Sequence, residues 1–214
     1  MTFDIKTYED TVLSYVIEYL NKNRYIEIKK LIPYIKSRIV KTDININEVG
    51  ICKILKSLFE QRLIAEGSKF TKEKVLERPP LRKRIYNFIK KNPGVYYSKI
   101  LNEFDIGRQA ATWHLEMLIK FDFINEIKIE NNVVYHDTSL DIQKVEMSFY
   151  LSNKKVIRIM DYFNENNTEG VTRSELSNGL NMHLNTVKKY LNKLVELNLI
   201  LKKKISNKYL FFKK

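Results

Sequence analysis

The sequence predicts a mainly α-helical fold with small β-hairpins, in which a unit of three helices and a hairpin is used three times in succession. Residues 94–124 match residues 170–200 at a shift of 76 without a gap, and Leu115 and Leu118 fall on Leu191 and Leu194. Most polar positions change between the two stretches, which is expected when one core is used twice. The chain of 214 residues also has only six Gly and four Pro, a balance that favours helices joined by short turns.

The first third of the chain repeats this pattern weakly. At a shift of 60, Leu55 falls on Leu115 and Leu58 falls on Leu118, whereas residues 38–47 form a longer connection. Pro33 lies inside the candidate second helix, where it would remove a hydrogen bond and kink the helix. Residues 1–77 are therefore predicted to be a divergent copy of the unit.

Residues 78–138 are predicted to be the second copy. Pro80 suits the first position of a helix over 81–92, which ends at the Pro93-Gly94 break. The remaining elements are helices over 98–104 and 108–121 and strands over 124–129 and 133–136. Three helices followed by a hairpin, in this order, define a winged helix-turn-helix.

Residues 139–214 are predicted to be a linker segment followed by the third winged helix-turn-helix. Between positions 138 and 152 the chain is apolar enough to pack rather than to serve as a flexible tether. Apolar residues at helical spacing predict a first helix over 153–166, and Thr172 with Glu175 forms a capping box at the start of the second. A third helix follows over 184–196, and strands over 199–205 and 209–212 form the hairpin.

The chain is strongly basic, and the excess charge is uneven. The formal net charge is +13 with a pI near 9.6, and residues 139–214 hold 14 basic and seven acidic side chains. A cationic surface concentrates polyanions but says nothing about sequence preference. An AT-rich genome, which inflates Lys, Asn and Ile everywhere, is the alternative explanation.

Two stretches resemble archaeal winged-helix transcription regulators of the MarR/ArsR type. The residues that carry the resemblance are 84–86, 92–95 and Ile100, followed by Thr112-Trp113-His114-Leu115-Glu116-Met117-Leu118, and residues 170–200 look similar. The resemblance covers about 78–137 and 153–212 well and 8–72 loosely. It implies a third helix in the DNA major groove and a hairpin wing against the backbone or the minor groove.

The candidate DNA-binding residues concentrate in the last copy. On its third helix, polar and basic side chains project opposite the buried Val187, and Asn can pair with adenine while Lys can contact guanine or phosphate. The hairpin carries a lysine cluster suited to phosphates or a narrow minor groove. The predicted set is Asn185, Thr186, Lys188, Lys189, Asn192, Lys193, Lys202, Lys203, Lys204 and Lys208.

The middle copy offers a weaker candidate surface. Arg108, Gln109 and Thr112 are predicted to contact DNA, but Trp113 is unusual for base readout and is predicted to lie at an interface, together with Phe149 and Tyr150. The triplet 82–84 (Arg-Lys-Arg) could hold phosphates. In the first copy Lys53 and Lys56 point outward, although Val49 and Glu60 weaken that face.

Catalysis, cofactors and metals are not expected. The chain has one cysteine, Cys52, and three scattered histidines, of which His114 is expected to pack in the core. Phosphate-binding glycine loops, paired catalytic carboxylates and nucleophile elbows are missing from the sequence. The apolar stretches are too short to cross a membrane, so a cytoplasmic, nucleoid-associated protein is expected.

Three functions remain open on the sequence alone. The first is a regulator that binds double-stranded DNA, alone or as a homodimer, through its third helices and wings. The second is a winged-helix scaffold for protein interactions, of the kind found in ESCRT-II-type membrane-remodelling subunits, chromosome-segregation proteins and polymerase-associated factors. The third is a chromatin-like binder without sequence preference. The DNA target, any effector ligand and the sign of regulation cannot be predicted from the sequence.

Overall fold

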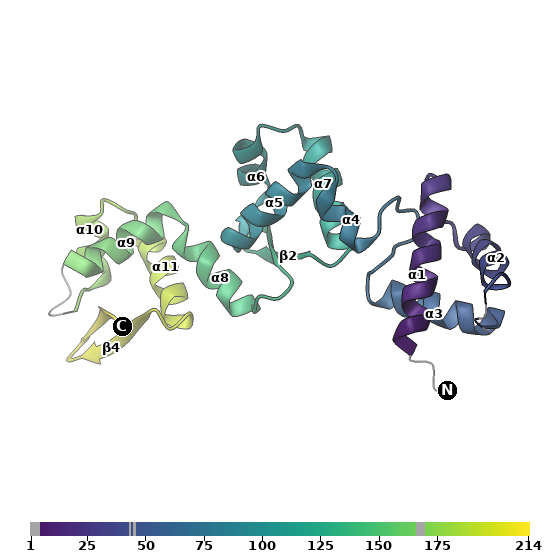
Figure 1. Ribbon diagram of the computed structural model, residues 1–214. Helices are drawn as coiled ribbons and strands as arrows, with labels where there is room; N and C mark the ends of the chain where they lie inside the picture. Colours follow the sequence, from purple (N-terminus) through teal and green to yellow (C-terminus); the bar gives the residue numbers. More distant parts are fainter. Residues whose placement is uncertain (1–4, 43, 45, 166–169) are drawn as a thin grey trace. The chain divides into compact units, whose positions relative to one another are not determined.

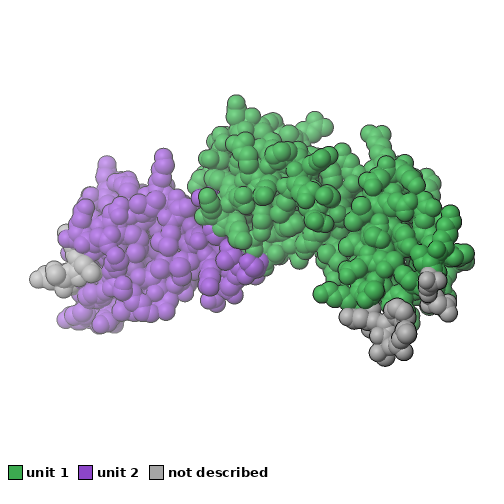
Figure 2. Space-filling model, viewed as in Figure 1, with its two compact units in different colours: residues 1–91, 96–138 green, residues 92–95, 139–214 purple. Residues whose placement is uncertain are grey.

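The protein consists of two compact units (Figure 2). The structure, a computed structural model, describes residues 5–42, 44, 46–165 and 170–214. Unit 1 comprises residues 1–91 and 96–138, and unit 2 comprises residues 92–95 and 139–214. Helices with small antiparallel sheets make up both units, as the sequence predicts (Figure 1).

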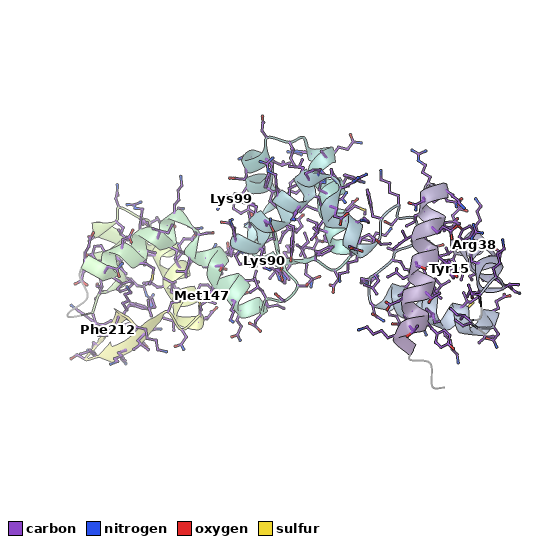
Figure 3. The ribbon with its side chains drawn as sticks, in the orientation of Figure 1. Tyr15, Arg38, Lys90, Lys99, Met147 and Phe212 are labelled. Carbon is purple, nitrogen blue, oxygen red and sulfur yellow. The ribbon has the colours of Figure 1, made fainter. Side chains whose placement is uncertain are left out.

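Unit 1 begins with a bundle of three helices, α1 (Ile5–Lys22), α2 (Ile28–Ile39) and α3 (Glu48–Glu60). Each helix contributes one apolar stripe to a shared core that includes Val16, Ile35 and Leu55. Helix α2 continues through Pro33, and Arg38 near its end pairs with Glu18 of α1 at 2.8 Å (Arg38 is labelled in Figure 3). The expected long connection lies between α2 and α3; its residues 43 and 45 are outside the described residues.

The first copy departs from a winged helix after α3. Among the described residues before position 80, the structure contains no strand, and residues 61–71 take an irregular path. Two backbone hydrogen bonds fix that path, from Gly67 N to Ile26 O and from Ile26 N to Ser68 O, both at 2.9 Å. A short helix α4 (Lys72–Glu77) then leads to the next copy. The divergent copy has the three helices but not the hairpin wing.

The second copy, most of which lies in unit 1, has the predicted three helices and hairpin together with one short strand that was not predicted. Helix α5 (Pro80–Lys91), strand β1 (Val95–Tyr96), helix α6 (Tyr97–Phe104) and helix α7 (Arg108–Lys120) precede the hairpin of β2 (Ile124–Ile129) and β3 (Asn132–Asp137). The strands lie in the order β1-β3-β2. The Tyr86 hydroxyl of α5 donates to Asp137 Oδ2 of β3 at 2.7 Å, and burial together with this bond raises the pKa of Tyr86 to about 12.

Unit 2 contains the third copy, preceded by one additional helix, α8 (Ile142–Leu151). The copy itself comprises α9 (Lys154–Glu165), α10 (Arg173–Gly179), α11 (Leu184–Glu196), β4 (Ile200–Ile205) and β5 (Lys208–Lys213). Position 166, the predicted last residue of the first helix, is outside the described residues. An isolated bridge from Val171 to Phe211 ties the chain before α10 to the hairpin.

The segment between the second and third copies forms helix α8. Asp141 caps it by accepting a hydrogen bond from Gln143 N at 2.8 Å, and Val145, Phe149 and Tyr150 are buried. Burial of these side chains confirms that this apolar segment packs, and the structure shows in addition that it is helical. Phe149 and Tyr150, predicted to lie at an interface, lie in the interior of the protein.

The start of α10 is held by the predicted capping box. Thr172 Oγ1 accepts from Glu175 N at 3.2 Å, and Glu175 Oε2 accepts from Thr172 N at 2.7 Å. These bonds, the backbone one first, lower the pKa of Glu175. Just before the box, Gly170 has φ +75°, and a Cβ there would lie 2.5 Å from the Phe212 ring, so glycine is required (Phe212 is labelled in Figure 3).

Replacing Thr172 with Ala is expected to destabilise unit 2 by about 1 kcal/mol, because α10 loses a cap and an amide loses its partner. The free energy of unfolding would be measured by urea denaturation followed by circular dichroism. The matched control is Thr186→Ala on α11, which replaces a threonine of the same unit without removing a helix cap. Equal losses in the two variants would show that the capping box contributes nothing specific.

Candidate nucleic-acid interface

Helix α11 presents one polar, cationic side to solvent. Its buried side consists of Val187, Tyr190, Leu191 and Leu194. Four exposed residues at positions i, i+3, i+4 and i+7 share the opposite side. We call this set the recognition face of α11: Asn185, Lys188, Lys189 and Asn192.

Two residues predicted for this face are placed elsewhere. Thr186 is half-buried. The Lys193 ammonium lies 3.4 Å from a Glu146 carboxylate oxygen and 3.3 Å from one of Glu196, and it lies over the Tyr150 ring. The Lys193 side chain is only 25% exposed. Lys193 therefore holds α8 against α11 and is not part of the recognition face.

The start of α11 depends on a residue, His183, whose role is not evident from the sequence. His183 Nδ1 accepts a hydrogen bond from Asn185 N at 3.2 Å and so caps the helix that carries the recognition face. Histidine is not among the usual N-cap residues, so the residue type does not indicate a cap at position 183. Only its position, directly before the apolar periodicity of α11, indicates that it could cap the helix.

The lysines of the hairpin are divided between its two faces. In the β4–β5 register Lys204 lies opposite Tyr209, and Lys203 lies opposite Leu210. Because side chains alternate along a strand, Lys202 and Lys204 share one face and Lys203 lies on the other. Lys202 Nζ stands 4.3 Å from the centre of the Tyr209 ring, and Lys203 Nζ stands 5.4 Å from that of Phe212. All three lysines are exposed, so the ribbon is positively charged on both faces.

An open hollow of about 640 Å³ lies between the start of α10 and the tip of the hairpin. Arg173 and Ser174 of α10 line it together with Lys208 and Tyr209 of β5. Lys208 also contributes to the lowered pKa of Glu175, so part of its charge is balanced locally. The hollow places Arg173 and Tyr209, which were not predicted as site residues, beside the predicted Lys208.

The equivalent side of α7 has a different chemistry. The residues 76 positions before the recognition face are Gln109, Thr112, Trp113 and Glu116; all are exposed and, with Arg108, they line an open hollow of about 730 Å³. The Tyr97 hydroxyl donates to Arg108 O at 2.8 Å and lies 2.9 Å from Thr112 Oγ1. The predicted residues of the middle copy are thus brought together, but Arg108 is their only cation and Glu116 opposes it.

Trp113 is 41% exposed and rests on a buried arginine. The Arg82 guanidinium carbon lies 4.5 Å from the centre of the Trp113 ring and 5.2 Å from that of Phe70. Arg82 is 0% exposed, so the expectation that it holds phosphates is wrong. Its neighbours Lys83 and Arg84 are exposed.

Arg82 carries its charge in the interior without a carboxylate among the described residues. Its Nη1 donates to Val75 O at 2.9 Å and to Arg78 O at 3.0 Å, whereas Nε and Nη2 have no hydrogen-bond partner in the part of the chain that the structure describes. Burial lowers the pKa of Arg82 to about 10. It also lies beside His114, which is buried as predicted.

The stability of unit 1 should fall as the pH is lowered through the range in which His114 titrates. Burial, with the nearby Arg82 charge, lowers the pKa of His114 below its ordinary value of 6.5. As pH falls, the unfolded chain takes up the proton first, so stability present above pH 6.5 is lost progressively below it. The urea midpoint, followed by the fluorescence of Trp113, should therefore drop between pH 7.5 and pH 5.0.

The matched pair of variants is His114→Phe and His183→Asn. The first should flatten this pH dependence, and the second, which changes unit 2, should leave it intact. A pH dependence that survives in His114→Phe would assign it to another group.

The first copy presents a mixed face on α3. Val49 is 63% exposed, Cys52 and Lys53 are exposed, and Lys56 pairs with Glu60 at 3.7 Å. In the part of the chain that is described, no three His, Cys, Asp or Glu residues group as metal ligands would, and none of the helices has the length and apolar character of a membrane span.

No family model matches the chain. The chain is similar to a protein of Methanocaldococcus jannaschii described as an uncharacterized HTH-type transcriptional regulator, with 27% identity over 131 residues. The match covers 61% of this chain and 32% of the relative, so the chain spans about a third of the relative's length. The similarity agrees with the helix-turn-helix architecture of the structure.

Proposed function

We propose that the protein is a DNA-binding transcription regulator without enzymatic activity, and that unit 2 is its principal DNA-binding unit. The observation that carries this proposal is the recognition face of α11. Two amides and two ammonium groups lie there on one side of the third helix of a winged helix-turn-helix. In this fold the third helix enters the major groove, where Asn can pair with adenine and Lys with guanine or phosphate.

The hairpin supports the same assignment. Its lysines are exposed on both faces of a narrow two-stranded ribbon, so the walls of a minor groove or the flanking phosphates could be contacted from both sides. The relative from Methanocaldococcus jannaschii is described as a transcriptional regulator, which agrees with this function. A protein engaged with DNA in this way would be nucleoid-associated.

The proposal is tested by using the full chain to select duplexes from a random pool. The affinity for the most enriched duplex is then measured by fluorescence anisotropy. We expect one enriched sequence and an affinity that falls with salt. The recognition face and the hairpin residues Lys202, Lys203, Lys204 and Lys208 together offer six lysines. If four to six of them contact phosphates, the slope of log K against log salt is about −4 to −5. Binding without any enriched sequence would indicate a chromatin-like binder, and no binding at low salt would overturn the proposal.

We infer a second candidate function for the middle copy alone, contact with a protein partner such as a second copy of this chain. The observation that favours it is the exposed Trp113 beside Glu116 on α7, because large aromatic side chains are enriched in interfaces and carboxylates repel phosphate. Sedimentation velocity should show self-association that Trp113→Ser abolishes. A monomer at all concentrations, with DNA affinity lost in Trp113→Ser, would instead place α7 on the duplex.

A further inference from the structure

A cavity of about 320 Å³ lies in unit 1 between α1 and residues 69–78. Its apolar wall is formed by Ile17, Leu20 and Phe70, and its rim carries the cationic side chains Lys69, Lys74 and Arg78. The volume is within the range of sites that enclose small organic molecules. A cavity with an apolar wall and a cationic rim is complementary to an amphipathic anion.

The charges at the rim are only partly neutralised. Lys74 Nζ pairs with Glu77 Oε2 at 2.8 Å, but Lys69 and Arg78 form no ion pair with any described residue. Lys69 instead lies over the Phe70 ring, with its Nζ 5.1 Å from the ring centre. Thr71, which also lines the cavity, is buried and its hydroxyl has no hydrogen-bond partner in the described part of the chain. Two cations, Lys69 and Arg78, thus remain available to an anionic ligand.

We propose that this cavity binds a small organic anion, an apolar body bearing one acidic group, with the body against Phe70 and Leu20 and the acidic group between Lys69 and Arg78. Two cations at one acidic group provide charge-assisted hydrogen bonds, which are stronger than neutral ones. The apolar wall selects against inorganic phosphate, which has no surface to bury there.

The walls of the cavity are connected to helix α7 through Arg82. The Phe70 ring contacts the Arg82 guanidinium on one side, and the Trp113 ring contacts it at 4.5 Å. Arg78 O, from another residue of the cavity, accepts a hydrogen bond from Arg82 Nη1. A ligand that displaces Phe70 or Arg78 therefore moves Arg82, against which Trp113 packs. An effector role for this site rests on the proposed function in DNA binding. The binding of the anion itself does not depend on that function.

The binding experiment uses no DNA. The full chain is titrated with 1-anilinonaphthalene-8-sulfonate, which is an aromatic body with one acidic group, and with N-phenyl-1-naphthylamine, which has the same body without the charge. We expect the sulfonate to bind with micromolar affinity and the Lys69→Ala/Arg78→Ala variant to bind it at least about tenfold more weakly. The neutral dye should lose less than about twofold in the same variant.

The matched control is Lys29→Ala/Lys53→Ala, which removes two exposed lysines from α2 and α3 of the same unit. It should bind the sulfonate as the parent does, and Lys69→Glu serves as a single-site check should the double variant lose its circular dichroism spectrum. Equal weakening in the control, or equal weakening of both dyes, would overturn the site.

The connection to α7 is read from Trp113, the one tryptophan in the chain. Bound sulfonate should quench the emission of Trp113 by energy transfer in the parent protein and in the Lys29→Ala/Lys53→Ala control. At the same dye concentration, the Lys69→Ala/Arg78→Ala variant should show no such quenching. If the dye binds as expected but leaves DNA affinity unchanged, the anion site stands and its effector role is overturned. If the chain does not bind DNA at all, the dye titrations still decide the site.

Discussion

Replacing Lys188 and Lys189 with Ala is expected to weaken binding to the selected duplex by about 10- to 100-fold at physiological salt. Each lysine lies on the recognition face of α11, and each contact to a base or a phosphate contributes on the order of 1 kcal/mol or more. Loss of two cationic contacts should also reduce the salt slope by about 2. Fluorescence anisotropy at four salt concentrations measures both quantities.

The matched control for this prediction is Lys154→Ala/Lys155→Ala. These two exposed lysines of α9 lie in the same unit, and their loss changes the net charge equally. We expect the control to keep most of the affinity and to lower the slope by less than one. If both pairs weaken binding equally, affinity reflects total charge only and α11 has no special role.

Replacing Arg82 with Ala is expected to destabilise unit 1 by about 3 kcal/mol, the largest effect on stability that we predict. The side chain is fully buried between Phe70 and Trp113, so its truncation leaves a cavity, and Val75 O and Arg78 O lose a donor. Urea denaturation followed by Trp113 fluorescence measures this loss, because the single tryptophan lies in unit 1.

Arg82→Met separates packing from charge. It keeps most of the volume and removes a guanidinium that burial penalises, as its pKa near 10 indicates. Replacing a poorly compensated buried charge by an apolar side chain of similar size is often close to neutral. We therefore expect a loss within about 1 kcal/mol for Arg82→Met, and equal losses for Met and Ala would show that the charge itself is required.

The third copy could be predicted from its sequence almost residue by residue. Helix α11 begins and ends where its apolar periodicity does, and the capping box before α10 forms as predicted. These signals are local, because apolar spacing and capping depend on neighbours within one or two turns. The burial of Val187 and Leu191 follows from the same periodicity.

The first copy was harder to predict, because its departure is not local. Leu63-Ile64 matches the start of β2 in the repeat, yet the chain turns away to pair its backbone with Ile26. That pairing brings together two segments that are distant in the sequence, and the spacing of apolar residues does not predict such a contact. Helix α8 was not predicted for a related reason. A ten-residue apolar stretch can form either a packed helix or an extended segment, and its sequence does not decide between them.

Arg82 and Lys193 show why predicting site residues from charge alone fails. Their charge makes both of them candidates for phosphate or DNA contact, but the structure places Arg82 in the core and pairs Lys193 with Glu146 and Glu196. A signal for Arg82 did exist. It lies three and seven residues before Ile85 and Ile89 on α5, so it shares their buried stripe.

The central claim, that α11 lies against the duplex, is tested most directly by cutting DNA from the helix itself. Cys52 is the only cysteine, so iron-EDTA can be tethered to Asn192→Cys in a Cys52→Ser background, with Asp161→Cys on α9 as the comparison. We predict strand scission confined to a few nucleotides of the selected site from position 192, and background cutting from position 161. Equal cutting from both positions, or none from 192 while the duplex remains bound, would contradict the account.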